Sequence, residues 1–249
     1  MGVASIAAYV GLALFMVFNV KSTVVYWTWT RDAAIKDLMD SPLLTPWGMH
    51  PAVVKAWTEL LSPYFDPKGK QGAIRMHMAV SMIITLLVTF NLVPMFRKKF
   101  MFMHRWLGRI CITFAIINAP GFYKLVMNFG ASKITQYIEL PIIAMIVFFG
   151  IQGWVSVRDK NIQAHRSSMI MFSCCFFFFG VQRICLLLAH ALHSMPTTSQ
   201  FLPLGPISKI SGADYWEVMW GLADVSAFML TFGLGAYNAY GPRIKAKSA

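Results

Sequence analysis

The chain has 249 residues, of which 57% are hydrophobic and 13% are charged, and its formal net charge is +12. These proportions exclude an ordinary water-soluble domain, because so much apolar surface would cause aggregation in water. They do not call for a nucleic-acid partner, because no basic arm with interleaved aromatic residues lies outside the apolar stretches. A basic rim that faces anionic lipid headgroups accounts for most of the positive charge.

Six long apolar stretches dominate the sequence. Each approaches or exceeds the ~20 residues that a helix needs to cross the hydrocarbon core of a bilayer. We therefore predict an all-α protein, a polytopic transmembrane bundle of six helices that forms a single domain over residues 1–249. The predicted spans are residues 3–20, 76–96, 106–127, 137–157, 167–192 and 215–237.

The segment between the first two spans, residues 30–75, is the only sizeable part outside the predicted membrane region. Within it, residues 51–62 are predicted to form a short amphipathic helix, because Pro51 suits a first helical turn and Trp57 and Leu60 share one apolar face. Such a helix lies flat on the outer membrane surface or packs against a neighbouring subunit.

The distribution of basic residues predicts the orientation of the bundle. The positive-inside rule counts basic residues in short loops close to helix ends, so both termini are placed inside. An organelle inner membrane, such as the mitochondrial one, agrees with this placement, but the sequence does not identify the membrane. The basic residues on the predicted inner side, opposed by the single acid Asp159, are Arg97, Lys98, Lys99, Arg105, Arg109, Arg158, Lys160, Arg166, Arg243, Lys245 and Lys247.

Two charged residues are expected deep in the membrane. Arg183 lies ~15 Å from the outer end of the fifth span and Asp224 ~13 Å from the same face in the sixth, at 1.5 Å per residue. An unpaired charge at this depth is costly, so we predict an Arg183–Asp224 ion pair. The pair either pins the two helices together or forms a proton or ligand site. A second pair, Lys124 with Glu139, is expected near the outer ends of the third and fourth spans, with a structural role.

Several motifs resemble those of a widespread family of predicted bacterial membrane proteins of unknown function. They are a histidine that opens one helix (His77), an H-R-x-x-G-R turn at residues 104–109 and an H-R-x-x-M segment at residues 165–169. The resemblance covers about residues 70–192 and departs from the family at Cys111, where many members have an aromatic residue. The core of this family is similar to the four-helix bundles of b-type cytochromes, so the resemblance implies haem b as a candidate cofactor.

The histidines have two interpretations. A bis-histidine haem needs two imidazoles from different helices at the same depth, and the same His-Arg pairs at helix starts are also suited to anchoring in lipid headgroups. On the inner face the candidate haem ligands are His104 and His165, with Arg105 and Arg166 available for the propionates. On the outer face, His77 is opposite His190 or His193.

Three functions follow from these observations. The first is an accessory subunit of a larger energy-transducing, respiratory-type membrane complex, which contacts other subunits through Trp47 and Trp57 and has no certain cofactor. The second is a haem b protein that transfers electrons at the inner face. The third is a small proton-coupled transporter that uses Arg183 and Asp224, although the sequence has no evident inverted repeat.

The partners expected are anionic lipid headgroups and other membrane subunits. The sequence contains no recognised catalytic motif, and whether the protein is an enzyme is left open. It contains no Cys-x-x-Cys pair, so no metal site is predicted.

Overall fold

The computed structural model describes residues 71–129, 133–194 and 212–247, together with a few isolated positions before residue 71. No strand occurs among the described residues, which confirms the all-α prediction. The expected first span, residues 3–20, and nearly all of the amphipathic helix at residues 51–62 lie outside them. The helices are α4 (Gln71–Leu92), α5 (Pro94–Lys99), α6 (Met101–Phe129), α7 (Lys133–Arg158), α8 (Ile162–Ser194) and α9 (Gly212–Lys247).

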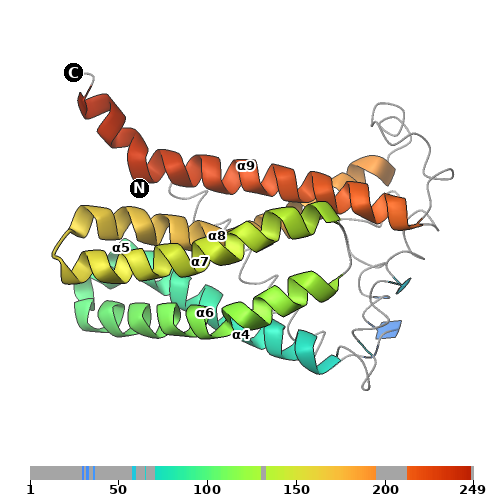
Figure 1. Cartoon of the computed structure of the whole chain (residues 1–249), viewed down its shortest axis with the longest axis horizontal. Coiled ribbons are helices and arrows are strands. Elements are labelled where there is room, and N and C mark those ends of the chain that lie inside the picture. The colour runs from blue at the N-terminus through green and yellow to red at the C-terminus, as the bar shows by residue number, and fades with distance from the viewer. Residues whose placement is uncertain are drawn as a thin grey trace.

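Five of these helices, all except α5, contain a stretch that is long and apolar enough to cross a membrane. They run roughly along one axis (Figure 1). Large apolar side chains point outward, such as Ile117 and Met229, which are 69% and 68% exposed, whereas Gln182 and Asp224 are fully buried. An apolar exterior, with the few buried polar side chains turned inward, suits lipid as the surrounding solvent. The chain is therefore an integral, multi-pass membrane protein.

The second predicted span, residues 76–96, has the wrong limits. The helix α4 begins earlier, at Gln71, and ends at Leu92, and a short separate helix follows. Val93 has extended backbone angles (φ −65°, ψ 117°) and Pro94 is the first residue of α5. A residue before proline avoids the helical conformation, and proline itself is favoured at a first helical position. The proline therefore ends one helix and begins the next within an otherwise continuous apolar run.

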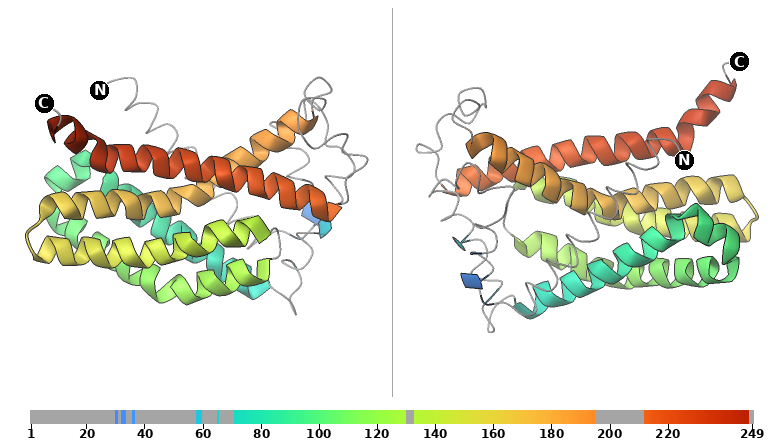
Figure 2. Two further views of the ribbon diagram at one scale, coloured as in Figure 1. Left: turned by 45° about the horizontal axis from the view of Figure 1, so that its top comes forward. Right: turned by 180° about the vertical axis from the view of Figure 1, so that it is seen from behind.

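Four of the helices form a ring in the order α4, α6, α7, α8, in which each helix packs against its two neighbours. The helix α9 lies outside this ring and packs on α8 and α7 (Figures 1 and 2). The centre of the ring is an apolar layer to which each helix contributes, including Ile84 of α4, Ile112 of α6, Ile146 of α7 and Phe172 of α8. As a result, α6 and α8 face each other across the ring.

Small residues allow the helices to approach closely. A Cβ atom added at Gly150 of α7 would lie 3.3 Å from the ring of Phe172, and one added at Gly221 of α9 would lie 3.1 Å from Ile134. At Gly235 of α9 an added Cβ would overlap Cys174 Sγ of α8. Glycine at helix contacts is typical of membrane proteins, in which association depends on close van der Waals packing.

The two ends of the ring differ in charge. One end contains α5, the first turns of α6 and α8, and the turn between α7 and α8 (Figure 1), and we call it the basic end. The other end, where α7 begins at Lys133, is called the opposite end. The placement of the basic end on the inner side of a membrane stays a prediction. Its basic residues are Arg97, Lys98, Lys99, Arg105, Arg109, Arg158, Lys160 and Arg166.

Candidate functional site

A group of polar side chains from three helices meets inside the bundle, in the half nearer the opposite end. Gln182 and Asp224 are fully buried, Thr135 is 3% exposed and Glu139 is 7% exposed. Polar and ionisable residues in a membrane-spanning region are costly to bury, so such a group marks either a structural network or a functional site. We call this group the carboxylate cluster. It consists of Thr135 and Glu139 of α7, Gln182 and Arg183 of α8, and Asp224 of α9.

The side chain of Gln182 joins the members of the carboxylate cluster. Its Nε2 donates hydrogen bonds to Glu139 Oε1 at 2.9 Å and to Asp224 Oδ1. Its Oε1 accepts a hydrogen bond from Arg183 Nη1 at 3.0 Å. The amide orientation follows from this chemistry, because the nitrogen faces two acceptors and the oxygen faces a donor. One neutral side chain therefore separates two carboxyl groups from a guanidinium and bonds to all three.

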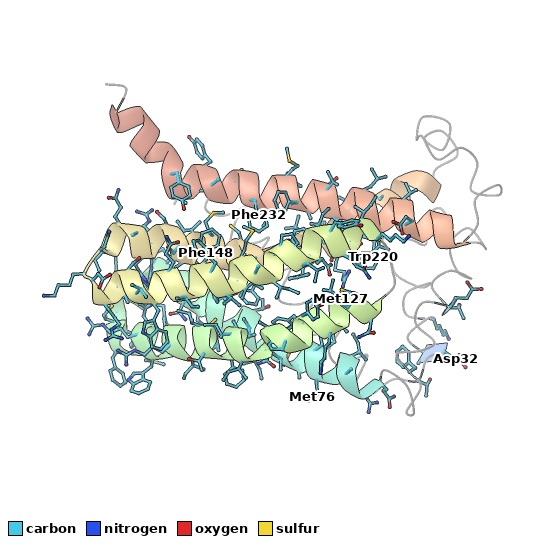
Figure 3. All side chains as sticks on the ribbon, viewed as in Figure 1. Asp32, Met76, Met127, Phe148, Trp220 and Phe232 are labelled. Carbon is cyan, nitrogen blue, oxygen red and sulfur yellow. The ribbon has the colours of Figure 1, made fainter. Side chains whose placement is uncertain are left out.

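Two further contacts complete the carboxylate cluster. Thr135 Oγ1 donates to Asp224 Oδ2 at 2.6 Å, so Asp224 accepts hydrogen bonds from two donors. Arg183 Cζ lies 4.5 Å from the centroid of the Trp220 ring, which is the distance of a cation–π interaction. Trp220 is 2% exposed and lies on the side of α9 that is turned toward the bundle (Figure 3). The indole face therefore stabilises the partly buried guanidinium.

The structure brings the predicted partners Arg183 and Asp224 into this one cluster. Gln182 bonds to both, and the charge of Arg183 acts on Asp224. A direct ion pair between them stays a prediction.

The second predicted pair, Lys124 with Glu139, is wrong. Glu139 is turned into the bundle, accepts a hydrogen bond from Gln182 and is acted on by the charge of Arg183, whereas Lys124 is exposed.

Sequence reasoning missed the most connected residue of the cluster. The prediction considered only charged residues within the spans, so it did not include the neutral Gln182, although this residue directly precedes Arg183. Thr135 was missed for the same reason. Its signal was the spacing of four residues from Glu139, which places both side chains on one face of α7.

The basic end contains both histidines that were predicted to lie on the inner face, His104 and His165. His104 and His165 are each the fourth residue of their helices, α6 and α8, which face each other across the ring. Arg97, His165 and Arg105 interact electrostatically with His104, so these residues belong to its surroundings. Arg105 and Arg166, which follow the two histidines in sequence, are exposed.

The ring of His165 has a defined orientation. Its Nδ1 lies 2.8 Å from the backbone oxygen of Gly153 in α7. Because a carbonyl oxygen can only accept, Nδ1 carries the proton of the neutral ring and Nε2 keeps a lone pair. Two other buried atoms at this end, His104 Nδ1 and Asn91 Oδ1, have no hydrogen-bond partner among the described residues. Asn91 lies beside Gly108, one turn after His104, where an added Cβ would lie 3.9 Å from Asn91 Oδ1.

His77 of α4 lies in the other half of the bundle. Its ring makes an edge contact with Phe122 at 5.6 Å between centroids, and the charge of Arg183 acts on it. Its Nδ1 is buried without a hydrogen-bond partner in the part of the chain that the structure describes. The side chains of His190 and His193, its expected partners, lie outside the described residues, so that pairing stays a prediction.

No group of three or more His, Cys, Asp or Glu residues that suits a metal ion occurs among the described residues. A haem needs only two protein ligands for its iron, so this finding bears on bare metal ions alone.

The family described as "Predicted membrane protein (DUF2306)" matches residues 74–202, which is more than half of the chain, and the chain belongs to this family. The match confirms the resemblance drawn from the H-R-x-x-G-R and H-R-x-x-M motifs. No curated protein and no solved structure matches the chain. The description of the family gives a membrane location and no activity. The features that bear on function are therefore the carboxylate cluster and the histidines of the basic end.

Proposed function

Since the chain belongs to this family of membrane proteins and holds two histidines at one end of a four-helix ring, we propose that it binds haem b through His104 and His165. The hydrogen bond from His165 Nδ1 to Gly153 is the observation that carries this proposal. A histidine that ligates a metal almost always donates its other ring N–H to a carbonyl, carboxylate or water, which fixes the ring and its tautomer. The bond leaves Nε2 of His165 available to the iron.

The surroundings of His104 support the same role. It is the fourth residue of α6, as His165 is of α8, and these helices face each other across the ring, which supports ligation of one iron by both imidazoles. Its buried Nδ1 has no partner among the described residues, so the second hydrogen bond typical of a ligating histidine is made by His165 and not by His104 in this part of the chain. Arg105 and Arg166 offer one cation beside each histidine for the two propionates.

A bound haem supplies one-electron redox chemistry at this site. The protein residues orient the group and balance its charge at the basic end, where electrons would be exchanged with a partner such as a quinol. The competing role for the two His-Arg pairs is anchoring to lipid phosphate, which needs no cofactor and gives a colourless protein.

The test is the visible spectrum of the detergent-purified full chain, produced with an ample supply of haem. The wild-type protein is expected to show a Soret band and a reduced α-band, with one haem per chain. Both bands should be lost in His104→Gln and in His165→Gln. His77→Gln is the matched control and should keep them, because His77 lies in the other half of the bundle. A colourless wild type that elutes as a folded protein, or bands that depend on His77 alone, would refute the proposal.

A role as accessory subunit of a larger energy-transducing complex remains a second candidate, and it does not exclude a bound haem. Trp47, Trp57 and the amphipathic helix on which this role was argued lie outside the described residues. The large apolar side chains on the lipid-facing surface give it general support, since such a surface also accepts neighbouring helices. Mild purification from the native membrane tests it: stable co-purifying subunits are expected, and a chain that elutes alone contradicts it.

A further inference from the structure

The carboxylate cluster contains more acid than base. Glu139 and Asp224 both bond to the same nitrogen of Gln182, so their carboxyl groups are no more than ~6 Å apart, the sum of two hydrogen-bond lengths. Arg183 is the cation whose charge acts on both of them. With both carboxyls ionised, the cluster would carry a net negative charge in a region without water, and such a charge is strongly disfavoured. With one carboxyl protonated, the cluster is neutral.

The hydrogen bonds indicate which carboxyl carries the proton. Asp224 accepts one hydrogen bond from Thr135 and one from Gln182, and two donors stabilise an ionised carboxylate. Glu139 accepts one hydrogen bond, from Gln182, among the contacts that the structure gives. Asp224 is therefore the better site for the negative charge that balances Arg183.

We propose that Glu139 is a proton-binding residue inside the membrane, which holds one exchangeable proton while Asp224 and Arg183 are charged. This proposal is independent of haem binding at the basic end. When Glu139 releases its proton, the cluster gains a negative charge that Gln182 and Arg183 have to stabilise. The contacts that join α7, α8 and α9 therefore depend on the protonation of Glu139.

The surroundings favour proton exchange at the opposite end. Glu139 is six residues after Lys133, so it lies ~9 Å from the start of α7 at the opposite end. Toward the basic end, the cluster meets the mainly apolar layer that includes Ile146 and Phe172, where the buried side chains of Ser173 and Cys175 donate hydrogen bonds to backbone oxygens of their own helix. His77 is the titratable group that faces Arg183 from α4. Exchange with the aqueous phase at the opposite end follows from this arrangement.

Infrared spectroscopy of the purified wild-type chain at neutral pH tests the proposal. A protonated carboxyl group has a C=O band separate from those of ionised carboxylates. We expect one such band, and we expect it to shift when the glutamate side-chain carboxyls are labelled with ¹³C and when the buffer is changed to D₂O. The two other glutamates, Glu59 and Glu217, are not in the cluster.

Isosteric variants identify the residue. Glu139→Gln should remove the band, whereas Glu217→Gln should keep it. The labelled wild type gives the answer even if Glu139→Gln does not fold. The proposal is overturned if the wild type has no carboxylic acid band, or if the band does not shift in D₂O. It is also overturned if the band is insensitive to glutamate labelling and disappears in Asp224→Asn, because the proton would then be on Asp224.

Discussion

The contact between α8 and α9 at Gly235 allows a quantitative test of the packing. An alanine at this position adds a Cβ that overlaps Cys174 Sγ and lies 3.5 Å from Cys174 Cβ. Forcing one extra carbon into a packed interface costs ~1–3 kcal/mol. Gly233, two residues earlier in α9, is the matched control, because a Cβ added there meets nothing within 4 Å.

The comparison isolates the packing term. Both substitutions replace glycine within the same helix and gain up to ~1 kcal/mol of helix propensity, which cancels between the two variants. The free energy of unfolding of Gly235→Ala should therefore be ~1–3 kcal/mol below that of Gly233→Ala. It is measured by titration with SDS in mixed micelles, followed by circular dichroism. Adding Cys174→Ala to Gly235→Ala removes the sulfur and should recover part of the loss. Equal free energies for the two single variants would refute the proposed contact between α8 and α9.

Two further predictions concern hydrogen bonds between helices. Gln182→Leu removes the side chain that bonds to both buried carboxyl groups of the cluster, and it should lower the free energy of unfolding by ~3 kcal/mol or more in the same titration. A loss below ~1 kcal/mol would contradict this. Glu217→Ala removes the carboxylate of α9 that accepts the backbone N–H of Lys133 at 3.0 and 3.1 Å and so caps the first turn of α7. It should cost ~1 kcal/mol and speed amide exchange in that turn, and unchanged exchange there would show that the cap is not formed.

The sequence was sufficient to predict the helical class and most of the spans, because the length of an apolar run is a direct consequence of the thickness of the bilayer. The span at residues 137–157 lies within α7, which extends only to Lys133 and Arg158. The failure at Pro94 has a local cause. Hydropathy measures how apolar a residue is and not whether it has a backbone N–H. The apolar run was therefore predicted as one span through Pro94, although this proline begins a new helix.

The partners inside the bundle were harder to predict because they depend on the rotation of each helix about its axis. Lys124 and Glu139 lie near the same ends of consecutive helices, and depth alone made them a plausible pair. Glu139 faces α8 and α9 instead, where Gln182 and Asp224 meet it. Depth can be read from position in a span, but the direction of a side chain is set by the packing of all neighbouring helices. The position of the two His-Arg pairs was predictable because each pair lies at the start of a helix. His104 and His165 therefore lie at the same end of the bundle, however each helix is rotated about its axis.

The positions of the two sites limit how they can influence each other. His165 and Gln182 lie on the same helix, 17 residues apart in the sequence, which corresponds to ~25 Å at 1.5 Å per residue. Between them α8 contributes buried Phe172, Phe176 and Phe178 to the apolar core. The buried polar side chains of α8 in this layer, Ser173 and Cys175, donate hydrogen bonds to backbone oxygens of α8, and the structure gives no chain of side-chain hydrogen bonds between His165 and Gln182 among the described residues. A substitution in one site should therefore leave the other unchanged, because distant sites without shared partners contribute additively. A haem at the basic end should accordingly keep its spectrum in Glu139→Gln, and the infrared band of Glu139 should persist in His165→Gln. If either substitution alters the signal of the other site, the two halves are coupled through a movement of α8 as a whole, and the protonation of Glu139 would then act on the proposed haem site.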